Sequence, residues 1–595
     1  AVYADLLRIH LRMTLAGHKT VLSQPTLATT DHASIHRLLH LFPRQTRVAN
    51  HLVLGGVPYG SDAGIAAALA TAVRRYDDVL TRLIAIPAIP SQLRLLILLL
   101  SARPSSLFAH HLRALPPYYT TASSPAQLPY AQTLRSRLLA ALSSILHISP
   151  RALTTAEAST ATHLQALLPS SLGGINLPDP TLLSHPAFLA SFADTLPLLL
   201  DDHILQPALI DTASWATSPS PTLVSASATF CAIAPLLAVS VDANPLHPGV
   251  RTRLTARDGS LALSLLHSVA NRHAQHVFSF AVFHHLYERL LSATSALTPI
   301  ARARLRGAAA PLTASLFTMY YVPAASSLTT PQLQFLVCHR LGIPLPFVRQ
   351  TPPPAHCSPR CHLFPPTTPI QHGHDLYPTL PHLLHHIACG AGGYRTSRHD
   401  ALVQLIAAVA RDLAHANIDT SQRLCSSAKS GKKVDIVITT PHTAPFVVAV
   451  DATVSCPLAP SYVSAASRDS SLIFESRAKE KNAKHLSGCQ GMGRAFIPVV
   501  FTTFGGIGPP EARAWLDSLF SDMFATEIAN GGTGQDTQHR RLLFYQSLQA
   551  SLVRSTTTMA VQLSAHDPLG GDDDGDEPPP HDAPIRPTRS QSAPG

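Results

Sequence analysis

The sequence predicts an α+β multidomain protein, mostly helical in its N-terminal two-thirds and with a mixed α/β domain near its C-terminus. Two observations predict this fold class. The N-terminal two-thirds are rich in Ala and Leu, and apolar residues recur there at helical spacing, as over 62–86. Towards the C-terminus, three apolar runs of strand length, at 434–439, 446–454 and 495–503, alternate with helical segments.

Composition sets broad limits on the partners. The 595 residues are enough for several domains, and 46% of them are hydrophobic, so sizeable cores can form. The formal net charge is +10, although an acidic run at 572–577 offsets part of the basic excess of the body. Such a balance suits a nucleic acid partner, but the arginines are scattered and many ordinary proteins are equally basic.

The sequence contains no segment that predicts a membrane span. Its most apolar run, at 93–100, is far shorter than the ~20 residues that a span needs, and it contains Arg94. Eight cysteines in a chain of this length, without a secretory signal, indicate reduced thiols. We therefore expect an intracellular protein, nuclear or cytoplasmic, without a membrane partner. The sequence does not indicate its oligomeric state.

The first motif lies in residues 1–120. An LAGHKT segment (15–20) is followed by LGGVPYG (54–60), which interrupts a strand-like stretch, and then by two predicted helices, over 62–86 and 90–100. This order resembles the end of a reverse transcriptase from a non-LTR retrotransposon. The resemblance implies that 1–120 are the end of the palm and the thumb. The metal-binding aspartates would then lie upstream of Ala1, so we expect a fragment without polymerase activity.

A helical connector domain is predicted over 121–346. Two of its segments, LPSSLGGINLPDPTLLSHPAFLASFADTL (168–196) and FLVCHRLGIPLP (335–346), resemble blocks that follow the thumb in the same elements. The Gly-Gly pair of the first block predicts a turn that brings a short extended piece onto a buried helix. We expect this turn to have a structural role and no chemistry.

Residues 347–393 are rich in Pro and His and are predicted to form loops. Within them Cys357-x3-Cys361 and, 23 residues later, His385-x3-Cys389 offer three thiolates and an imidazole. These groups can complete a tetrahedral Zn²⁺ shell, which would stabilise a segment with little core of its own. Non-LTR elements with a restriction-like endonuclease carry such a knuckle here, so the resemblance supports the same four ligands. Neighbouring histidines and free thiols in a low-complexity loop are the alternatives.

The most informative stretch is the α/β domain predicted over 394–560. Asp435 begins one apolar strand and Asp451 lies near the end of the next, so an antiparallel hairpin would place them side by side. Because an unpaired charge in such a strand is costly, a shared Mg²⁺ or a basic partner would compensate both acids. Mg²⁺ at this position could activate water for attack on a phosphate. Acids satisfied by backbone donors or by an arginine, without catalysis, are the alternative.

The predicted order of helix, strands, helix and strand is that of a PD-(D/E)XK nuclease core. Four motifs resemble those of the restriction-endonuclease-like domain of non-LTR retrotransposons: Arg398-His399-Asp400, Lys433-Val434-Asp435, Val450-Asp451-Ala452-Thr453, and a helix containing Lys479, Lys481 and Lys484. The resemblance implies a nuclease that nicks target DNA and exposes a 3′-OH, from which an element reverse-transcribes its own RNA. Target DNA and element RNA are therefore the expected partners.

The implied site has Asp435 and Asp451 as Mg²⁺ ligands and a helix lysine that stabilises the attacked phosphate. Thr453 stands where many nucleases of this superfamily have their active-site lysine, so Lys481 or Lys484 is predicted to replace it. Asp400 and Val434 also depart from the family motifs, in place of Asn and Pro.

Two further questions stay open at this stage. Arg398 and His399 are candidate catalytic residues, but they can equally cap or brace their helix. The departures from the motifs and the missing palm favour an alternative function, a catalytically dead, domesticated or relic protein that binds nucleic acid. Residues 561–595 are acidic, then basic and Ser-rich, and are predicted to be a disordered tail.

Overall fold

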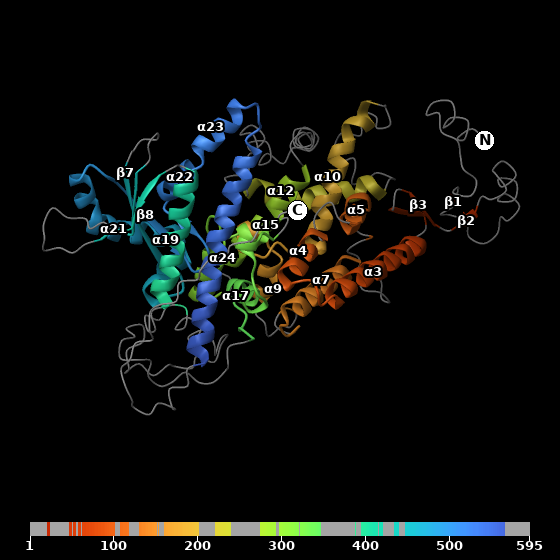
Figure 1. Cartoon of the computed structure of the whole chain (residues 1–595). Helices are drawn as coiled ribbons and strands as arrows, with labels where there is room; N and C mark the ends of the chain where they lie inside the picture. Colours follow the sequence, from red (N-terminus) through yellow and green to blue (C-terminus); the bar gives the residue numbers. More distant parts are fainter. Residues whose placement is uncertain are drawn as a thin grey trace, which may run out of the picture.

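A computed structural model gives the fold of the protein (Figure 1). It describes residues 21–23, 47–49, 51–54, 57–60, 62–101, 107–117, 119, 130–150, 153, 160–201, 221–239, 274–292, 297–319, 322–346, 387, 394–413, 416–420, 433–439 and 447–565. The protein is mostly helical, and a mixed five-stranded sheet lies among helices near the C-terminus. The predicted α+β class is therefore confirmed.

The N-terminal part contains short strands and two predicted helices. Its elements are β1 (Val21–Ser23), β2 (Arg47–Ala49), β3 (His51–Leu54), β4 (Val57–Gly60), α3 (Asp62–Ala85) and α4 (Ser91–Ser101). β3 and β4 form an antiparallel hairpin, so the strand-like stretch around the glycines folds back on itself. α3 and α4 agree with the helices that the apolar spacing predicts.

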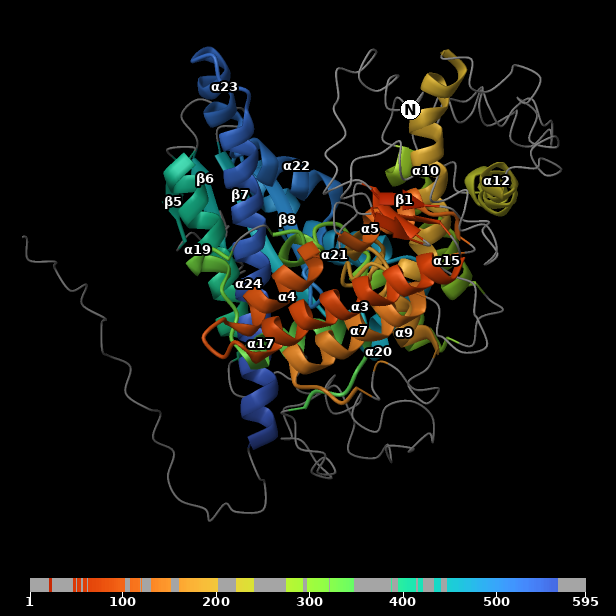
Figure 2. The ribbon, with the colours of Figure 1, turned by 90° about the vertical axis from the view of Figure 1, so that its right-hand side faces the viewer.

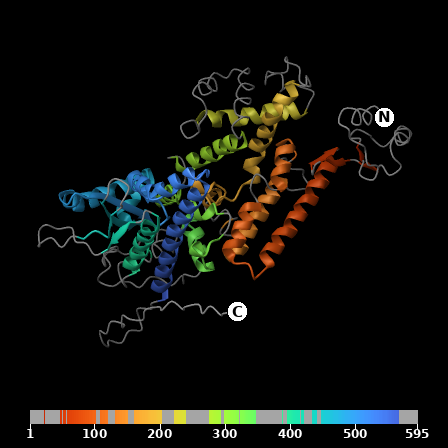
Figure 3. The ribbon, with the colours of Figure 1, turned by 45° about the horizontal axis from the view of Figure 1, so that its top comes forward.

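Helices make up the described parts of the connector region. They are α5 (Leu107–Ala114), α7 (Tyr130–Leu146), α9 (Thr160–Ala166), α10 (Pro180–Asp201), α12 (Pro221–Val239), α15 (Ala274–Leu291), α16 (Pro299–Ala308) and α17 (Thr330–Leu341). α3 and α7 lie side by side (Figure 3). Leu95, Leu134, Leu142 and Val337 belong to one buried core, so α4, α7 and α17 share a single apolar interior.

The Gly-Gly turn at 173–174 is held against α17. Gly173 has a φ of +83°, and a Cβ on Gly174 would lie 1.9 Å from the Leu168 carbonyl oxygen, so neither position suits a side chain. The fully buried Arg340 of α17 donates to the carbonyl oxygens of Gly174, at 2.6 Å, and of Ser170. The guanidinium of Arg340 thus stabilises the turn by donating hydrogen bonds to two of its backbone carbonyl groups.

The sheet has the order β5-β6-β7-β8-β9. Its strands are β5 (Asn417–Asp419), β6 (Ile436–Thr439), β7 (Val447–Ser455), β8 (Ala495–Thr502) and β9 (Ile507–Gly508). All neighbouring pairs are antiparallel except β7 and β8, which are parallel. A parallel pair needs a crossover connection, and here α20 (Pro460–Arg468) and α21 (Ser471–Gly491) supply it.

Alternating strand residues separate the two faces of the sheet. Ile436, Ile438, Val448 and Val450 pack in a core with α19 (Tyr394–Leu413), whereas Val437 and Ala449 pack with Cys489 of α21. Because successive strand residues point to opposite faces, the odd-numbered positions of β6 and β7 face α21. In β7 this alternation places Asp451 on the face that α21 covers.

Among the described residues, three helices follow the sheet. They are α22 (Pro510–Ser518), α23 (Ser521–Ala529) and the long α24 (Gln535–Ala565). α24 packs against both α19 and α17 (Figure 2). It also continues past 560, so the first five residues of the expected tail are helical. The sequence of α24 does not predict that it packs against α19 and α17, because its many Ser, Thr and Gln residues are typical of an exposed helix.

Two buried contacts connect the helical region with the C-terminal domain. The His339 ring of α17 is stacked between Phe335 and Phe504, with centroid distances of 5.2 and 4.2 Å. Gln549 of α24 accepts from the Leu316 amide at 2.9 Å and donates to the Thr313 carbonyl at 2.6 Å. Among the helices that the structure describes, none has both the length and the apolar character of a membrane span.

Candidate active site

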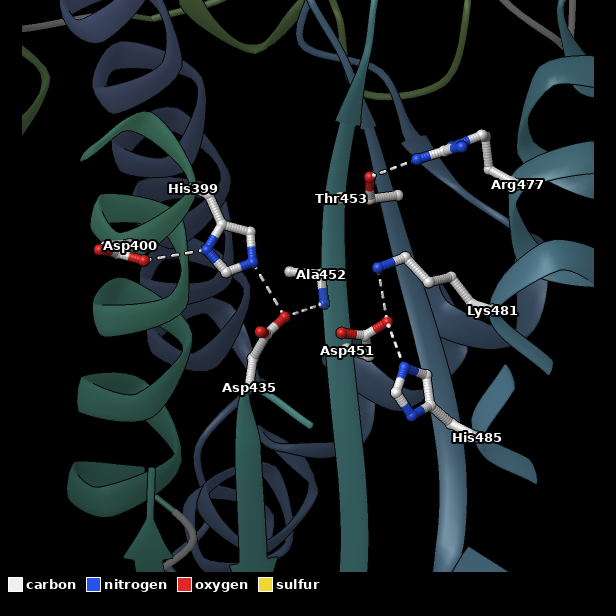
Figure 4. Close-up of polar contacts among 9 residues, drawn as sticks. All are labelled: His399, Asp400, Asp435, Asp451, Ala452, Thr453, Arg477, Lys481 and His485. Carbon is white, nitrogen blue, oxygen red and sulfur yellow. Dashed lines mark hydrogen bonds and ion pairs between the residues drawn. The ribbon is translucent and has the colours of Figure 1, made fainter. Parts of the chain in front are cut away.

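Asp435 and Asp451 come together at the start of the β6–β7 ladder (Figure 4). Ile436 pairs with Val450, so Asp435, the residue before β6, lies opposite Asp451. Asp451 lies on the face that α21 covers, whereas Asp435 precedes β6 in a bend and its side chain contacts His399 of α19. The Asp435 and Asp451 side chains are only 20% and 6% exposed. The two acids are therefore neighbours at this end of the sheet, and each is approached by a different helix.

Asp435 is bound by two donors. Its Oδ2 lies 2.9 Å from His399 Nε2 of α19 and 2.6 Å from the backbone N of Ala452. Burial disfavours the charged carboxylate, but the hydrogen bond and positive charge of His399 and the Ala452 amide outweigh it and lower the pKa of Asp435. Asp435 is therefore a carboxylate at neutral pH, held in one orientation.

His399 has acids on both ring nitrogens. Its Nδ1 lies 3.0 Å from Asp400 Oδ1, opposite the nitrogen that contacts Asp435. The hydrogen bond to Asp435 raises the pKa of His399 to about 9, with a further contribution from Asp400 and against the effect of burial. An imidazolium donates from both nitrogens, which matches two carboxylate neighbours.

Asp451 has the opposite electrostatic balance. Burial, followed by the negative charge of Asp435, raises its pKa to about 6, although Lys481 favours the charged form. Lys481 Nζ lies 2.7 Å from Asp451 Oδ2 and forms an ion pair with it, although the angles do not suit a hydrogen bond. His485 Nε2 lies 3.7 Å from the same oxygen. Asp451 is thus a nearly buried carboxyl group whose pKa stays raised although basic side chains lie next to it.

One face of α21 supplies the basic residues. Arg477, Lys481 and His485 are spaced by four residues and so lie on one side of the helix, towards β7. Arg477 donates to Thr453 Oγ1 at 3.1 Å, which places a guanidinium on the same face of β7 as Asp451. Lys484, one of the two predicted lysines, is exposed, and within the described part of the chain it has no ion pair with either acid.

Sequence reasoning missed Arg477 and His485. The four-residue spacing on either side of Lys481 is a signal for both residues. It is weak by itself, because a basic residue on a charged helix usually faces solvent.

Arg398 and His399 have different surroundings. Arg398 is 3% exposed and donates to the carbonyl oxygen of Ile387 at 3.0 Å and to Thr556 of α24 at 3.4 Å. It therefore braces α19 against α24, whereas its neighbour His399 contacts the acid pair. Because adjacent helix residues point in different directions, the two residues have different roles: Arg398 braces the helix, and His399 remains a candidate for the active site.

A cleft of about 330 Å³ lies next to the acids. It is lined by residues of the first turns of α19 and by two residues of β7: Arg395, Thr396, Arg398, His399, Thr453 and Val454. The cleft shares His399 and Thr453 with the acid site. It offers space for a substrate group beside Asp435.

The donor set fits a hard divalent cation. Mg²⁺ is usually held by one or two carboxylates and keeps several waters, and the paired acids supply such ligands. The nearly buried Asp451 carboxyl next to Asp435 favours a cation at the acids, because burial first and the charge of Asp435 second disfavour its charged form. No group of three or more His, Cys, Asp or Glu residues converges within the described ranges, as a Zn²⁺ centre would require. Cys357, Cys361, His385 and Cys389, the predicted Zn²⁺ ligands, lie outside those ranges.

No protein-family model matches this chain, and no curated protein is significantly similar to it.

Proposed function

We propose that the C-terminal domain is a Mg²⁺-dependent endonuclease that nicks one strand of DNA, in a protein derived from a non-LTR retrotransposon. The observation that carries this proposal is the pairing of Asp435 with Asp451 across β6 and β7, facing the Lys481 ammonium. Two acids and one lysine at a sheet end resemble a PD-(D/E)XK site. The order of α19, the strands and α21 supports the same comparison.

Each side chain of the site would have a separate role in the reaction. Asp435 and Asp451 would hold Mg²⁺, which supplies an activated water and stabilises negative charge on the phosphate. His399 and the Ala452 amide fix the orientation of the Asp435 carboxylate. Lys481 places its ammonium where it can hold a non-bridging phosphate oxygen, and Arg477 supplies a second cation one helical turn away.

The expected partners follow from the same proposal. A basic chain with a net charge of +10 attracts a polyanion, and target DNA together with element RNA would be that partner. The knuckle of Cys357, Cys361, His385 and Cys389 would bind Zn²⁺ and help to hold nucleic acid. Target DNA places the activity in the nucleus or, for an extranuclear target, in the cytoplasm.

A relic that binds DNA without cutting it is the second candidate. The observation in its favour is that Lys481 and His399 already compensate the acids, as a structural ion-pair network would. The Thr at position 453 points the same way, because the superfamily lysine is missing there.

Nicking of a supercoiled plasmid in Mg²⁺ tests the proposal. We expect open circles with the wild type and none with Asp451→Asn or in EDTA. Asp412→Asn, the same change at an exposed position of α19, should cut like the wild type. Equal cutting by the wild type and Asp451→Asn, or no cutting by either, would refute the enzyme. Plasmid binding without cutting would identify the relic.

A further inference from the structure

The cleft beside the acids contains a buried cation with an unused donor. Arg398 lines it and is 3% exposed. One guanidinium nitrogen donates to Ile387 and Thr556, but Nε has no hydrogen-bond partner among the residues that the structure describes. Nor does any carboxylate within those ranges form an ion pair with Arg398. A buried charge that lacks a counter-ion is costly, so this position favours an anion in the cleft.

The other lining groups also suit an anion. Arg395 is exposed at the rim, and Thr396 and Thr453 add hydroxyl groups. α19 begins at Tyr394 and runs for 20 residues, so its first turns bring unsatisfied N–H groups and the positive end of the helix dipole to the cleft. His399 forms the wall nearest Asp435.

We propose that this cleft binds a phosphodiester group of the DNA strand, next to the one that is cut. The identification of the ligand as DNA rests on the proposed function, whereas the anion site itself rests on Arg398, Arg395 and the end of α19. The cleft adjoins the acids through His399, so a strand with one phosphate at Asp435 and Asp451 can place its neighbour here. The site would fix the register of the strand and would contribute to affinity and not to the chemical step.

A charge placed in the cleft tests the proposal by binding. The Kd of the full chain for a short DNA duplex is measured in EDTA, so that cutting plays no part. We expect Thr396→Glu to raise Kd about tenfold, because it replaces a charge-assisted contact with repulsion. Ser397→Glu is the matched control: it makes the same change on the same exposed turn, but Ser397 does not line the cleft. An acid in the first turn favours a helix, so neither variant should unfold.

The salt dependence of binding gives an independent measurement. Arg395→Gln should reduce the slope of log Kd against log salt by about 1, the loss of one phosphate contact. Arg411→Gln, an exposed arginine at the far end of α19, should leave the slope unchanged. Equal effects of Thr396→Glu and Ser397→Glu, or of the two arginine variants, would overturn the assignment, as would a wild type that binds no duplex.

Two outcomes separate this proposal from the nuclease itself. Selective weakening by Thr396→Glu in a protein that never nicks DNA would support the phosphate site and remove the enzyme. A nuclease whose duplex affinity is indifferent to Thr396→Glu would keep the enzyme and remove the site. Inorganic phosphate should compete poorly at matched ionic strength; strong competition would assign the cleft to free phosphate and overturn the strand contact.

Discussion

Asp435 and Asp451 lie next to the first rung of the β6–β7 ladder, the Ile436–Val450 pair, and each has its own basic partner from a different helix. His399 of α19 approaches Asp435, and Lys481 of α21 approaches Asp451. The partners leave the two carboxyl groups different: the pKa of Asp435 is lowered and that of Asp451 is raised to about 6. An acid pair with divided affinities for protons is a common feature of catalytic sites.

Replacing Asp451 should not destabilise the fold. Because burial and the charge of Asp435 raise its pKa, the charged Asp451 opposes folding at neutral pH. We expect Asp451→Asn to leave the free energy of unfolding at pH 7 unchanged or higher, measured by denaturant titration. A loss of more than about 1 kcal/mol would mean that the Lys481 ion pair dominates, and nicking data for this variant would need a folding control.

The two lysines of α21 should differ sharply in their effect on cutting. Lys481→Met removes the ammonium beside Asp451 and is expected to slow plasmid nicking at least about a hundredfold, as the loss of one charge-stabilising donor does. Lys484→Met changes an exposed lysine on the same helix and should stay within about twofold of the wild type. Similar rates for the two variants would contradict the role given to Lys481.

His399 should make stability depend on alkaline pH. Its pKa is raised from 6.5 to about 9, chiefly by the hydrogen bond to Asp435, so the folded state binds its proton more tightly than the unfolded state. The stabilisation is fully present below pH 6.5 and is lost as the pH rises through about 9. We expect a loss of about 1 kcal/mol over this window, after solvent screening, and its absence in His399→Gln. A variant that keeps the wild-type slope would contradict the ion pair.

His339 should act in the acid range. Full burial lowers its pKa from 6.5 to about 3, with a smaller effect of Arg304, so the ring is neutral between Phe335 and Phe504. The stabilisation from the neutral His339 ring is fully present above pH 6.5 and is lost as the pH falls towards 3. Between pH 6.5 and 4 we expect a loss of about 3 kcal/mol that His339→Phe removes. Thermal unfolding monitored over this range measures the slope; equal slopes for the two proteins would refute it.

The connector turn gives a test of backbone packing. An alanine Cβ at position 174 would lie 1.9 Å from the Leu168 carbonyl oxygen, so Gly174→Ala should lower the free energy of unfolding by about 3 kcal/mol. Gly491→Ala, where nothing lies within 4 Å, should be neutral or slightly stabilising. Denaturant titration compares them, and a tolerated Gly174→Ala would show that the turn can move.

Part of this architecture is legible in the amino-acid sequence. One acid precedes the first apolar strand, one lies within the next, and a turn bracketed by prolines separates them, so an antiparallel hairpin makes Asp435 and Asp451 neighbours. The choice between Lys481 and Lys484 does not follow, because it depends on how α21 is rotated over β7. Helical spacing around Lys481 would have identified Arg477 and His485 once that rotation was known.

Other elements lack a local signal. β5 and β9 have three and two residues, too few for periodicity to predict a strand. The polar sequence of α24 gives no indication that Gln549 will bond to a backbone far away in the chain. Such contacts arise from tertiary packing, and local sequence patterns do not predict them.

Binding of Mn²⁺, a spectroscopic substitute for Mg²⁺, tests the shared-cation claim most directly. Electron paramagnetic resonance of the full chain counts bound ions without requiring DNA or turnover. We predict one Mn²⁺ site in the wild type that weakens strongly in both Asp435→Asn and Asp451→Asn and persists in Asp412→Asn. Equal Mn²⁺ binding by all four proteins, or none by the wild type, would contradict a metal held between these two acids.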